Sequence, residues 1–294
     1  MSAGLPFLLL INPSAAGGRA ERRLPEAERV LGERGVVHRT LLTESIEHAR
    51  AQAREAIERG EGVAVMSGDG LIGQVGGVLA GSETPLGILP GGRGNDLARV
   101  VGIPKDLRAA AEILAAGRTR TIDVGEVNGH RFLGIASCGF DSECNRIAND
   151  VKLVRGNLVY LYSVPRALAA WRPAAFEVSV DGETHSFEGY SVAVANNRAY
   201  GGGMYIAPDA ELDDGKLDVV LTAQVGKLRF LANLPKVFKG AHLDSPEVTV
   251  VRGKEVEIRA DRSFAVYADG DAVTELPARI RLLPRALKLL APPE

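Results

Sequence analysis

Cysteine and long apolar segments are both scarce in this sequence. Its 294 residues include two cysteines, Cys138 and Cys144, and five scattered histidines. Two cysteines without a zinc or thioredoxin spacing argue against a disulfide-stabilised secreted scaffold and against a metal site built on His and Cys. No apolar run approaches the roughly 18 residues of a membrane-spanning helix, and the first residues lack the basic stretch of a signal peptide. We therefore expect a cytoplasmic protein that meets a membrane only from its surface.

An excess of one sign of charge is lacking as well. The formal net charge is −2, which argues against a protein whose whole surface grips nucleic acid, so nucleic acid is not an expected partner. Hydrophobic residues make up 46% of the chain and charged residues 24%, which is typical of a globular protein. The length exceeds that of one ordinary compact core, so the sequence predicts two domains.

The first 127 residues alternate short apolar runs with helical patterns. Strands are expected at residues 6–12, 36–43, 62–67 and 85–90, and helices at residues 18–35, 44–60, 71–81, 95–102 and 106–117. This alternation predicts an α/β domain with a parallel, doubly wound sheet. The loops after Asn12, Ser67 and Pro90 each follow a strand, so we expect them to gather at the carboxyl edge of the sheet, where such proteins bind ligands.

The remaining residues, 128–294, have the texture of an antiparallel β domain. Strands are expected at residues 131–140, 175–182, 184–197, 216–222, 245–260, 263–271 and 278–284, with helices at residues 156–171 and 226–238. Many of these strands alternate apolar and polar residues, as strands with one solvated face do. We therefore expect a domain boundary near residue 127, with the last segment able to pack back on the N-terminal domain.

The stretch "SGDGLIGQV" carries the spacing G-x-G-x-x-G, with Asp69 between two of its glycines. A dinucleotide fingerprint would need an acidic residue about 20 positions later, but Glu83 comes too early and Asp96 lies in another glycine-rich loop. A P-loop is excluded because the sequence has no G-K-[ST]. Backbone N–H groups of Gly68 and Gly70 at a helix start can instead hold phosphate. Asp69 then binds Mg²⁺ or assists a proton transfer, as in phosphoryl transfer, or it only caps a helix.

Two further glycine-rich turns follow expected strands. One is "NPSAAGG", which begins at Asn12, and the other is "PGGRGND", which begins at Pro90. Each precedes an expected helix, as the turn around Asp69 does. Three such turns at one sheet edge favour a phosphate-binding cradle over three unrelated turns.

Five motifs occur in the order of a known family: "NPSAAGG", "SGDGLIGQV", "PGGRGNDLAR", "GGGMYIAPDAELDDGKLDVV" and "ADGDAV". By these motifs nearly the whole chain resembles the diacylglycerol kinase catalytic-domain family, which includes bacterial diacylglycerol kinases, related lipid kinases and sphingosine kinases. The resemblance implies an α/β nucleotide-binding domain over residues 1–127 and a β-sandwich domain for the lipid substrate over residues 128–294. It also implies an ATP- and Mg²⁺-dependent lipid kinase, with diacylglycerol converted to phosphatidic acid as the first expectation.

The resemblance also implies roles for individual residues. Asp271, in the family's closing D-G-E motif, would deprotonate the lipid hydroxyl, and Asp69 would organise Mg²⁺ or assist that proton transfer. Asp141 would hydrogen-bond the lipid head group, with helix capping as its alternative. The residues expected to contact the nucleotide are Asn12, Pro13, Ser14, Ala15, Ala16, Gly17, Thr43, Ser67, Gly68, Gly70, Leu71, Gln74, Gly92, Arg93, Gly94, Asn95 and Asp96.

The "ELDDGKLD" stretch resembles the family's structural magnesium loop. Asp214 would bind this Mg²⁺ through its side chain, and Glu211 and Lys216 would contribute backbone oxygens, which a hard cation prefers. This ion would be distinct from the Mg²⁺ that accompanies ATP. The alternative is an ordinary β-turn between two strands.

Four substitutions depart from the family pattern and keep other functions open. Leu71, Gln74 and Arg93 stand where the family has Thr, Glu and Thr, and Asp271 replaces its last Glu. An amide is a weaker ligand for Mg²⁺ than a carboxylate, whereas Arg93 adds a fork that can grip phosphate. One alternative is therefore a catalytically degenerate nucleotide- or lipid-binding regulatory protein. Sphingoid bases or other lipids are alternative acceptors, and NAD kinases and Rossmann oxidoreductases fit the motifs less well.

The segment "NRIANDVKLVRGNLVYLYSVPRALAAWRP" mixes basic residues with apolar and aromatic ones such as Leu168 and Trp171. Such mixtures suit anionic membrane surfaces, so we expect this segment at the inner face of the membrane. An amphipathic helix packed on the β domain is the alternative. A lipid substrate at the membrane surface is the expected partner, and a homodimer is left open.

Overall fold

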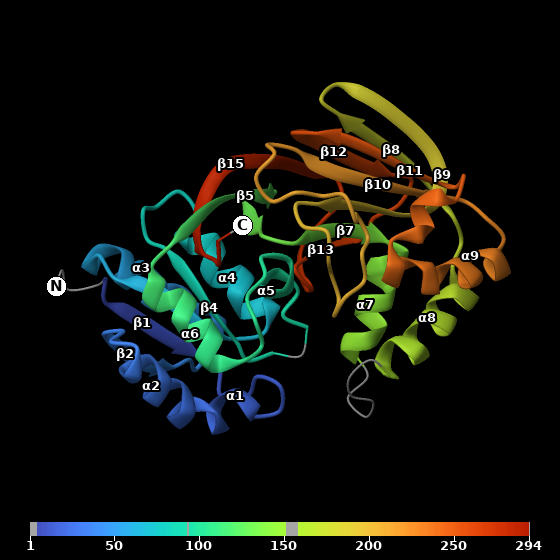
Figure 1. Cartoon of the computed structure of the whole chain (residues 1–294). Coiled ribbons are helices and arrows are strands. Elements are labelled where there is room, and N and C mark those ends of the chain that lie inside the picture. Colours follow the sequence, from blue (N-terminus) through green and yellow to red (C-terminus); the bar gives the residue numbers. More distant parts are fainter. Residues whose placement is uncertain (1–4, 93, 151–157, 294) are drawn as a thin grey trace.

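The computed structural model describes residues 5–92, 94–150 and 158–293 of the chain. An α/β part and a β part lie side by side (Figure 1). Within these residues the two parts share one continuous sheet of 15 strands, so backbone hydrogen bonds join them. Within the described residues, no helix combines the length and the apolar character that a membrane crossing needs.

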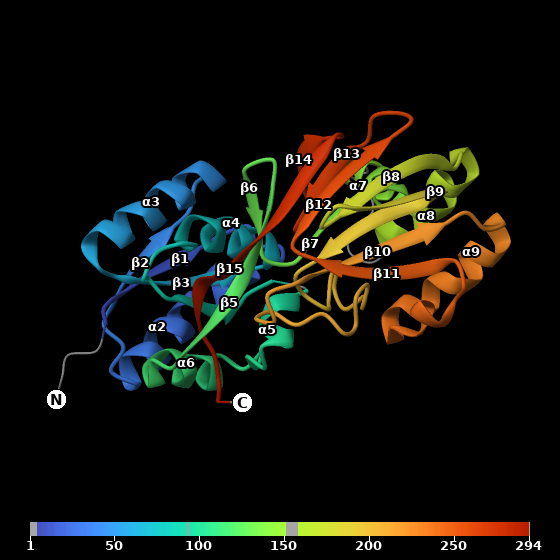
Figure 2. The ribbon, with the colours of Figure 1, turned by 90° about the horizontal axis from the view of Figure 1, so that it is seen from above.

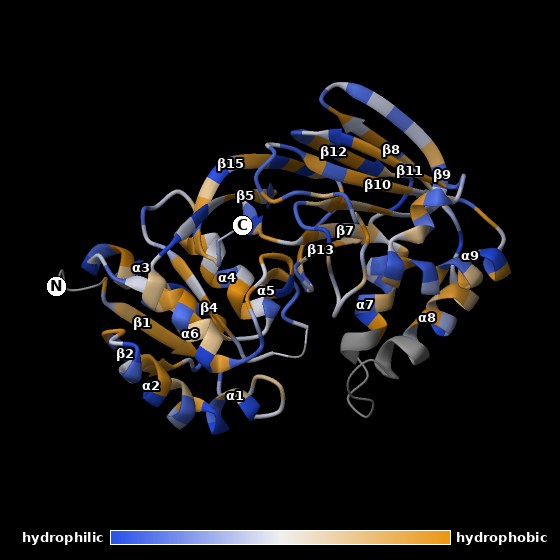
Figure 3. Ribbon diagram, viewed as in Figure 1, coloured by the Kyte–Doolittle hydropathy of each residue, from blue (hydrophilic) through white to orange (hydrophobic). Residues whose placement is uncertain are grey.

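Parallel strands form the centre of the α/β part. They are β1 (Phe7–Ile11), β2 (His38–Leu42), β3 (Gly62–Ser67) and β4 (Leu86–Pro90), adjacent in the order β2-β1-β3-β4. Every residue of β1, β3 and β4 is buried, and Figure 3 shows β1 and β4 as hydrophobic. Strands that are apolar on both faces suit a sheet covered on both sides. The predicted parallel sheet is confirmed.

Helices connect these strands and cover the sheet. They are α1 (Arg19–Arg22), α2 (Leu24–Glu33), α3 (Ile46–Arg59), α4 (Asp69–Leu79), α5 (Asp96–Val100) and α6 (Leu107–Ala116). Figure 2 shows α3 and α4 on one face of the sheet and α2 and α6 on the other. The single helix expected at residues 18–35 is divided into α1 and α2. Pro25 has no N–H to donate, so it suits the first turn of a helix, and α2 begins beside it.

Antiparallel strands form the β part. They are β7 (Ile135–Gly139), β8 (Ala174–Val180), β9 (Glu183–Ala195), β10 (Leu217–Ala223), β11 (Val248–Gly253), β12 (Glu255–Ala260), β13 (Ala265–Ala268) and β14 (Asp271–Glu275). Buried and exposed residues alternate along β8, and inward side chains such as Phe176 and Val192 form one apolar cluster. The predicted antiparallel character is confirmed.

Two long strands join the α/β part to the β part. β15 (Ala278–Leu290) pairs with β5 (Thr119–Val127) over most of its length, with β12 near its start, and with β4 at Leu289 and Leu86. β5 continues through a turn into the short strand β6 (His130–Phe132). β5 was not expected from the sequence because Asp123 interrupts its apolar pattern. The Asp123 carboxylate is buried and accepts hydrogen bonds from Gly215 N and Arg285 N, partners that are distant in the sequence.

Helices α7 (Phe140–Asp150), α8 (Leu158–Ala170) and α9 (Lys227–Asn233) lie at the far end of the β part (Figure 1). An aromatic cluster anchors them, in which Trp171 stacks on Tyr190 at 6.1 Å between ring centroids. Leu168 and Trp171 are only 6% and 7% exposed. The expectation that these two residues present apolar surface to a membrane is therefore wrong, because they pack inward. Residues 151–157 of the same segment lie outside the described residues.

Candidate active site

The turns that follow β3 and β4 touch through their backbones. A Cβ atom on Gly92 would lie 2.3 Å from Gly68 Cα, and one on Gly91 would lie 3.1 Å from Ser67 N. Glycine is required at so close an approach. Asn95, with a left-handed φ of 51°, closes the second turn: Gly92 N donates to its Oδ1 at 3.0 Å, and its Nδ2 donates to Gly92 O at 3.1 Å. These two glycine turns therefore converge at the carboxyl edge of the sheet.

The turn after β1 leads into α1, beside the same edge. Ser14 donates from its N and its Oγ to Asn12 Oδ1, at 3.0 and 2.8 Å. A pocket of about 380 Å³ separates α1 from the turn after β4; its lining consists of Arg19, Ala20, Arg23, Pro90, Gly91, Gly92, Asn95 and Lys105. Cationic side chains beside the backbone of a glycine turn form a surface that suits phosphate. Sequence reasoning missed Arg19, Arg23 and Lys105, since nothing in their spacing distinguishes them from ordinary surface cations.

Asp69, the first residue of α4, links the glycine turns to each other. Its Oδ1 accepts hydrogen bonds from Asp96 N at 2.6 Å and Leu97 N at 3.4 Å, so it caps the start of α5. Its Oδ2 lies 2.7 Å from where a Cβ of Gly94 would be. Burial, and then the charge of Asp96, raise the pKa of the Asp69 carboxyl. Capping thus occupies one oxygen of a carboxylate whose negative charge is poorly compensated.

Asp96 connects this cluster to the β part. Its Oδ2 accepts a hydrogen bond from Gly202 N at 2.7 Å, and its Oδ1 pairs with Arg99 at 3.0 Å. Gly202 belongs to the "GGGMYIAP" motif. Two of the five motifs, more than a hundred residues apart, therefore meet at this side chain.

The turn between β13 and β14 brings a second carboxylate against α4. Asp269 accepts hydrogen bonds from the backbone N–H groups of Leu133, Gly134 and Ile135, at 2.8, 2.8 and 3.3 Å. A Cβ atom on Gly73 of α4 would lie 2.7 Å from Asp269 Oδ2. Burial raises the pKa of Asp269 to about 6, and the charge of Asp69 adds to this effect. Sequence reasoning missed Asp269, although it is the first residue of the closing D-G-E motif.

Gln74 connects α4 directly to Asp271. Gln74 Nε2 donates to Asp271 Oδ2 at 3.0 Å, and Gln74 Oε1 accepts a hydrogen bond from Arg50 of α3. Arginine can only donate, so it fixes which end of the amide faces Asp271. Asp69 and Asp271 are thus both held on α4, Asp69 as its first residue and Asp271 by contact with Gln74 little more than one turn later. Arg50 carries no signal in the sequence that would have assigned it to this site.

Other predicted site residues lie in different environments. Thr43 Oγ1 donates to Ile11 O at 3.1 Å, so its hydroxyl fastens the end of β2 to β1. Leu71 is 8% exposed and packs in the core of the α/β part. Burial raises the pKa of Asp141, at the start of α7, to about 6. Arg93 lies outside the described residues. The roles given to these residues stay predictions.

The residues present do not offer a free site for the structural Mg²⁺. Asp214 Oδ2 accepts a hydrogen bond from Arg252, and its Oδ1 accepts one from Lys216 N at 3.0 Å. Arg252 Nε also pairs with Asp218 at 3.1 Å. A guanidinium therefore supplies positive charge at the predicted magnesium loop. In the described part of the chain, no three His, Cys, Asp or Glu side chains cluster closely enough to hold a metal ion.

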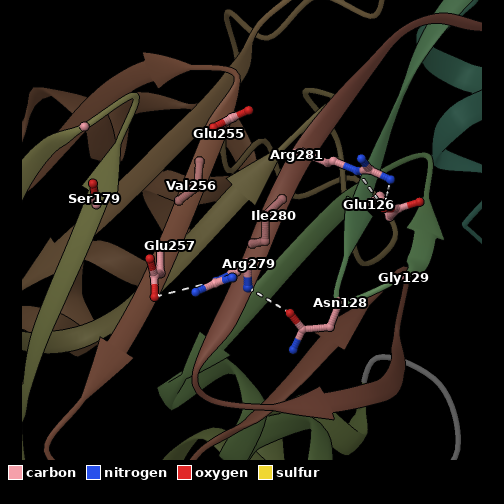
Figure 4. A pocket seen from close by; sticks show the side chains of 11 residues that line it. Glu126, Asn128, Gly129, Ser179, Glu255, Val256, Glu257, Arg279, Ile280 and Arg281 are labelled. Carbon is pink, nitrogen blue, oxygen red and sulfur yellow. Dashed lines mark hydrogen bonds and ion pairs between the residues drawn. The ribbon is translucent and has the colours of Figure 1, made fainter.

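A larger groove, of about 520 Å³, lies on the outer face of β12, β15 and β5, and none of the predicted site residues lines it. Figure 4 shows its charges meeting one another, Glu126 with Arg281 and Glu257 with Arg279. The Glu126 to Arg281 ion pair is 2.6 Å and the Glu257 to Arg279 pair 3.9 Å. Charges that neutralise each other on an open sheet face do not suggest a reaction site.

Comparison with known proteins identifies the family of this chain. Residues 6–127 match the family described as "Diacylglycerol kinase catalytic domain". A diacylglycerol kinase of Mycobacterium tuberculosis (strain H37Rv) is 37% identical over 291 residues, covering 96% of this chain and 94% of that protein. The chain belongs to the diacylglycerol kinase catalytic-domain family. It is a lipid kinase, a phosphotransferase whose acceptor is an alcohol.

The comparisons cover most of both parts of this chain. Residues 134–291 match the "YegS C-terminal NAD kinase beta sandwich-like domain", which confirms the predicted β-sandwich. A diacylglycerol kinase of Bacillus subtilis (strain 168) is 26% identical and covers 97% of this chain and 96% of its own. The crystal structure of a diacylglycerol kinase from Bacillus anthracis (strain Sterne) has the same fold, with a TM-score of 0.77 at 23% identity, covering 98% of this chain and 97% of that one.

Proposed function

We propose that this kinase transfers the γ-phosphoryl group of ATP to the free hydroxyl of a diacylglycerol and so makes phosphatidic acid. The observation that carries the proposal is the hydrogen bond between Gln74 and Asp271, which holds a carboxylate of the β part against the helix that begins at Asp69. The Mycobacterium tuberculosis and Bacillus subtilis relatives, which cover nearly the whole chain, are named diacylglycerol kinases, and this supports diacylglycerol over a sphingoid base.

The nucleotide phosphates bind at the converging glycine turns. Backbone N–H groups of these turns, at the N-terminal ends of helices, donate to phosphate oxygens. Arg19, Arg23 and Lys105 line the adjoining pocket and add positive charge there. Binding that depends on the backbone tolerates changes of side chain, so Leu71, whose side chain points into the core, does not weaken the proposal.

The acidic residues nearby fit the Mg²⁺ that accompanies ATP. Burial raises the pKa of both Asp69 and Asp269; the charge of Asp96 adds to this effect at Asp69, and the charge of Asp69 adds to it at Asp269, so a cation would relieve the repulsion. Magnesium bound with a nucleotide needs only one or two protein carboxylates, because phosphate and water supply the other oxygens. When bound, it neutralises charge on the phosphates. Gln74 leaves one carboxylate fewer than the family pattern has at this place.

Asp271 acts as the general base. Its carboxylate accepts the proton of the acceptor hydroxyl while the hydroxyl oxygen forms a bond to the γ-phosphorus. The bond from that phosphorus to the β,γ-bridging oxygen breaks, and ADP leaves with the bridging oxygen. Gln74 holds the Asp271 carboxylate in place by donating to Oδ2. The kinase reaches its lipid at the inner face of the membrane through the α7–α8 end of the β part, where Arg166 is exposed.

The experiment that tests this proposal compares Asp271→Asn with wild type. We expect transfer of labelled phosphate to diacylglycerol to fall by a factor of about 10²–10⁴, with ATP binding unchanged, because only the proton acceptor is lost. Asp244→Asn, which removes an exposed carboxylate elsewhere, is the control. Unchanged turnover in Asp271→Asn would reject Asp271 as the base. Wild-type enzyme that binds ATP but labels no lipid in a mixed extract would point instead to a regulatory binding protein.

A further inference from the structure

We propose that a second pocket, between α3, α4 and β6, is a binding site for a phosphate-type dianion. The pocket has a volume of about 350 Å³. Its lining includes Arg50, Arg54, Gln74, His130, Arg131 and Asp269. It shares no lining residue with the pocket at the glycine turns, which Arg19 and Lys105 line. The two pockets are therefore distinct.

The charge of this second pocket is positive and largely unneutralised. Arg50, Arg54 and Arg131 contribute three guanidinium groups. Asp269, the one carboxylate in the lining, is occupied by three backbone N–H groups. For the residues that the structure describes, the only carboxylate ion pair of these arginines is a 3.9 Å contact from Arg131 to Glu126. Glu126 is itself bound more closely, at 2.6 Å, by Arg281. Few carboxylates therefore compete with an incoming anion for these guanidinium groups.

Neutral groups hold two of the three guanidiniums in place. Arg131 Nη1 donates to Gly77 O at 2.9 Å and Ala80 O at 2.8 Å, at the carboxyl end of α4. Arg50 Nη2 donates to Gln74 Oε1. These contacts orient the side chains and leave their charge available. A guanidinium presents a planar fork of N–H donors that matches two phosphate oxygens. Because these contacts already order the Arg50 and Arg131 side chains, little further side-chain entropy is lost when the anion binds.

The walls leave room for such a ligand because α4 presents little side chain here. Gly73, Gly77 and Val78 are its other lining residues, and two of these have no side chain. Arg54, exposed on α3, makes no hydrogen bond or ion pair with any residue in the described parts of the chain. Its guanidinium is therefore free to fold onto a bound dianion. The favoured ligand is a phosphate monoester or inorganic phosphate, whose double charge matches several arginines.

The second pocket also communicates with the reaction site. Arg50 donates a hydrogen bond to Gln74, and Gln74 donates one to Asp271. Two hydrogen bonds would therefore connect an Arg50 that binds the anion to the general base. Arg50 is a positioning residue in this arrangement, since it acts through Gln74. We expect occupancy of the pocket to change kcat by at least about twofold, with the KM for ATP unchanged. This second part rests on the proposed function.

The binding test is calorimetry on the full chain with a non-hydrolysable ATP analogue present, so that the glycine turns are occupied. Inorganic phosphate and glycerol 3-phosphate are the soluble probes. Vesicles of phosphatidylcholine, with and without one-fifth phosphatidic acid, are the lipid probes. Soluble probes that bind as well as the vesicles indicate a free phosphate ligand, and binding only to the vesicles containing phosphatidic acid indicates a lipid head group. Either result supports the site.

Variants decide whether binding occurs in this pocket. Arg54→Gln should weaken binding about tenfold, as expected for losing a charge-assisted hydrogen bond, and Arg54→Lys should restore part of it. Arg59→Gln, which removes an exposed charge from the same helix outside the pocket, should bind like wild type. Arg23→Gln, at the other pocket, should also bind like wild type.

Four results would overturn parts of the inference. Absence of binding by every probe, or equal affinity in Arg54→Gln and wild type, rejects the site. Loss of binding in Arg23→Gln assigns the anion to the glycine turns and also rejects it. Binding that leaves kcat unchanged rejects the link to Asp271 and keeps the site. If wild type fails to bind ATP or to phosphorylate lipid, the proposed function is rejected. The pocket can still be tested in that case, by comparing anion binding to wild type and to Arg54→Gln without nucleotide.

Discussion

The two halves of this kinase contribute to the site by different physical means. The α/β part offers glycine turns whose backbones touch, as Gly92 and Gly68 do, and in the proposed function backbone N–H groups of these turns bind phosphate. The β part offers individual carboxylates, Asp269 and Asp271, each held by specific donors. Substitutions other than those of the touching glycines should therefore be tolerated in the first region, whereas loss of a carboxylate should be costly in the second.

Loss of Asp269 is the strongest probe of the second region after Asp271 itself. Asp269→Ala should lower the free energy of unfolding by about 2–4 kcal/mol at pH 7, because the N–H groups of Leu133, Gly134 and Ile135 lose their acceptor. Urea denaturation measures this change. A variant as stable as wild type would mean that these N–H groups find other partners and that the turn is not held by this side chain.

The pH dependence of the same variant sharpens this result. The pKa of Asp269 is about 6 in the folded chain and near 3.8 in the unfolded one, so the folded state binds the proton first as the pH falls. Its contribution to stability is full below the unfolded pKa and is lost as the pH rises through about 6. The stability gap between wild type and Asp269→Ala should thus be about 1 kcal/mol wider at pH 5 than at pH 7. The comparison uses the difference in stability between wild type and Asp269→Ala because His242, whose pKa is lowered by burial, changes the stability of both proteins with pH in the opposite direction.

Gly92→Ala tests the claim that the first region depends on close backbone contact. The new Cβ would lie 2.3 Å from Gly68 Cα, so the turns must separate, at a cost of about 1–3 kcal/mol. Nucleotide affinity, measured by calorimetry, should fall about tenfold. Gly32→Ala, where a Cβ meets nothing within 4 Å, is the matched control and should bind normally. Equal affinity in both variants would separate nucleotide binding from the contact of the turns.

The variant Arg252→Met tests whether the Arg252 guanidinium supplies the positive charge that a structural Mg²⁺ would otherwise supply. Asp218 is buried, and without Arg252 its charge and that of Asp214 lose their partner, so stability should fall by about 1–3 kcal/mol. Added Mg²⁺ should then raise the melting temperature of the variant but not that of wild type. Equal stabilisation of both proteins by Mg²⁺ would support the magnesium loop as first predicted.

The smallest effect is expected at the α7–α8 end of the β part, which is proposed to meet the membrane. Arg166 is exposed on α8, and each such cation contributes about 1 kcal/mol to attraction by an anionic surface. Arg166→Gln should therefore weaken sedimentation with phosphatidylglycerol vesicles about fivefold while leaving activity on detergent-dispersed diacylglycerol unchanged. Vesicle binding equal to wild type would argue against α8 as the surface that meets the membrane.

Much of the fold and part of the site could be predicted from local sequence patterns. The burial of β1, β3 and β4 follows from their continuous apolar runs, and the three glycine turns follow from their position after those strands. β5 escaped detection because Asp123 breaks its apolar pattern, and the partners that satisfy that carboxylate, Gly215 and Arg285, are distant in the chain. Trp171 was misread for a similar reason: whether an aromatic side chain faces inward depends on what covers it, here Tyr190.

The parallel sheet, the antiparallel β part and the ordered motifs of the family could all be predicted from the sequence, because hydrophobic period and glycine spacing are local properties. Only the folded chain shows that Asp271 contacts Gln74, that Asp69 caps α5 while Asp269 lies beside Gly73, and that Arg50 joins the site. These contacts join residues 24 to 197 positions apart. The contacts of Asp269 and Asp271 with α4 also depend on how β15 and β5 hold the two parts together, which no local pattern encodes.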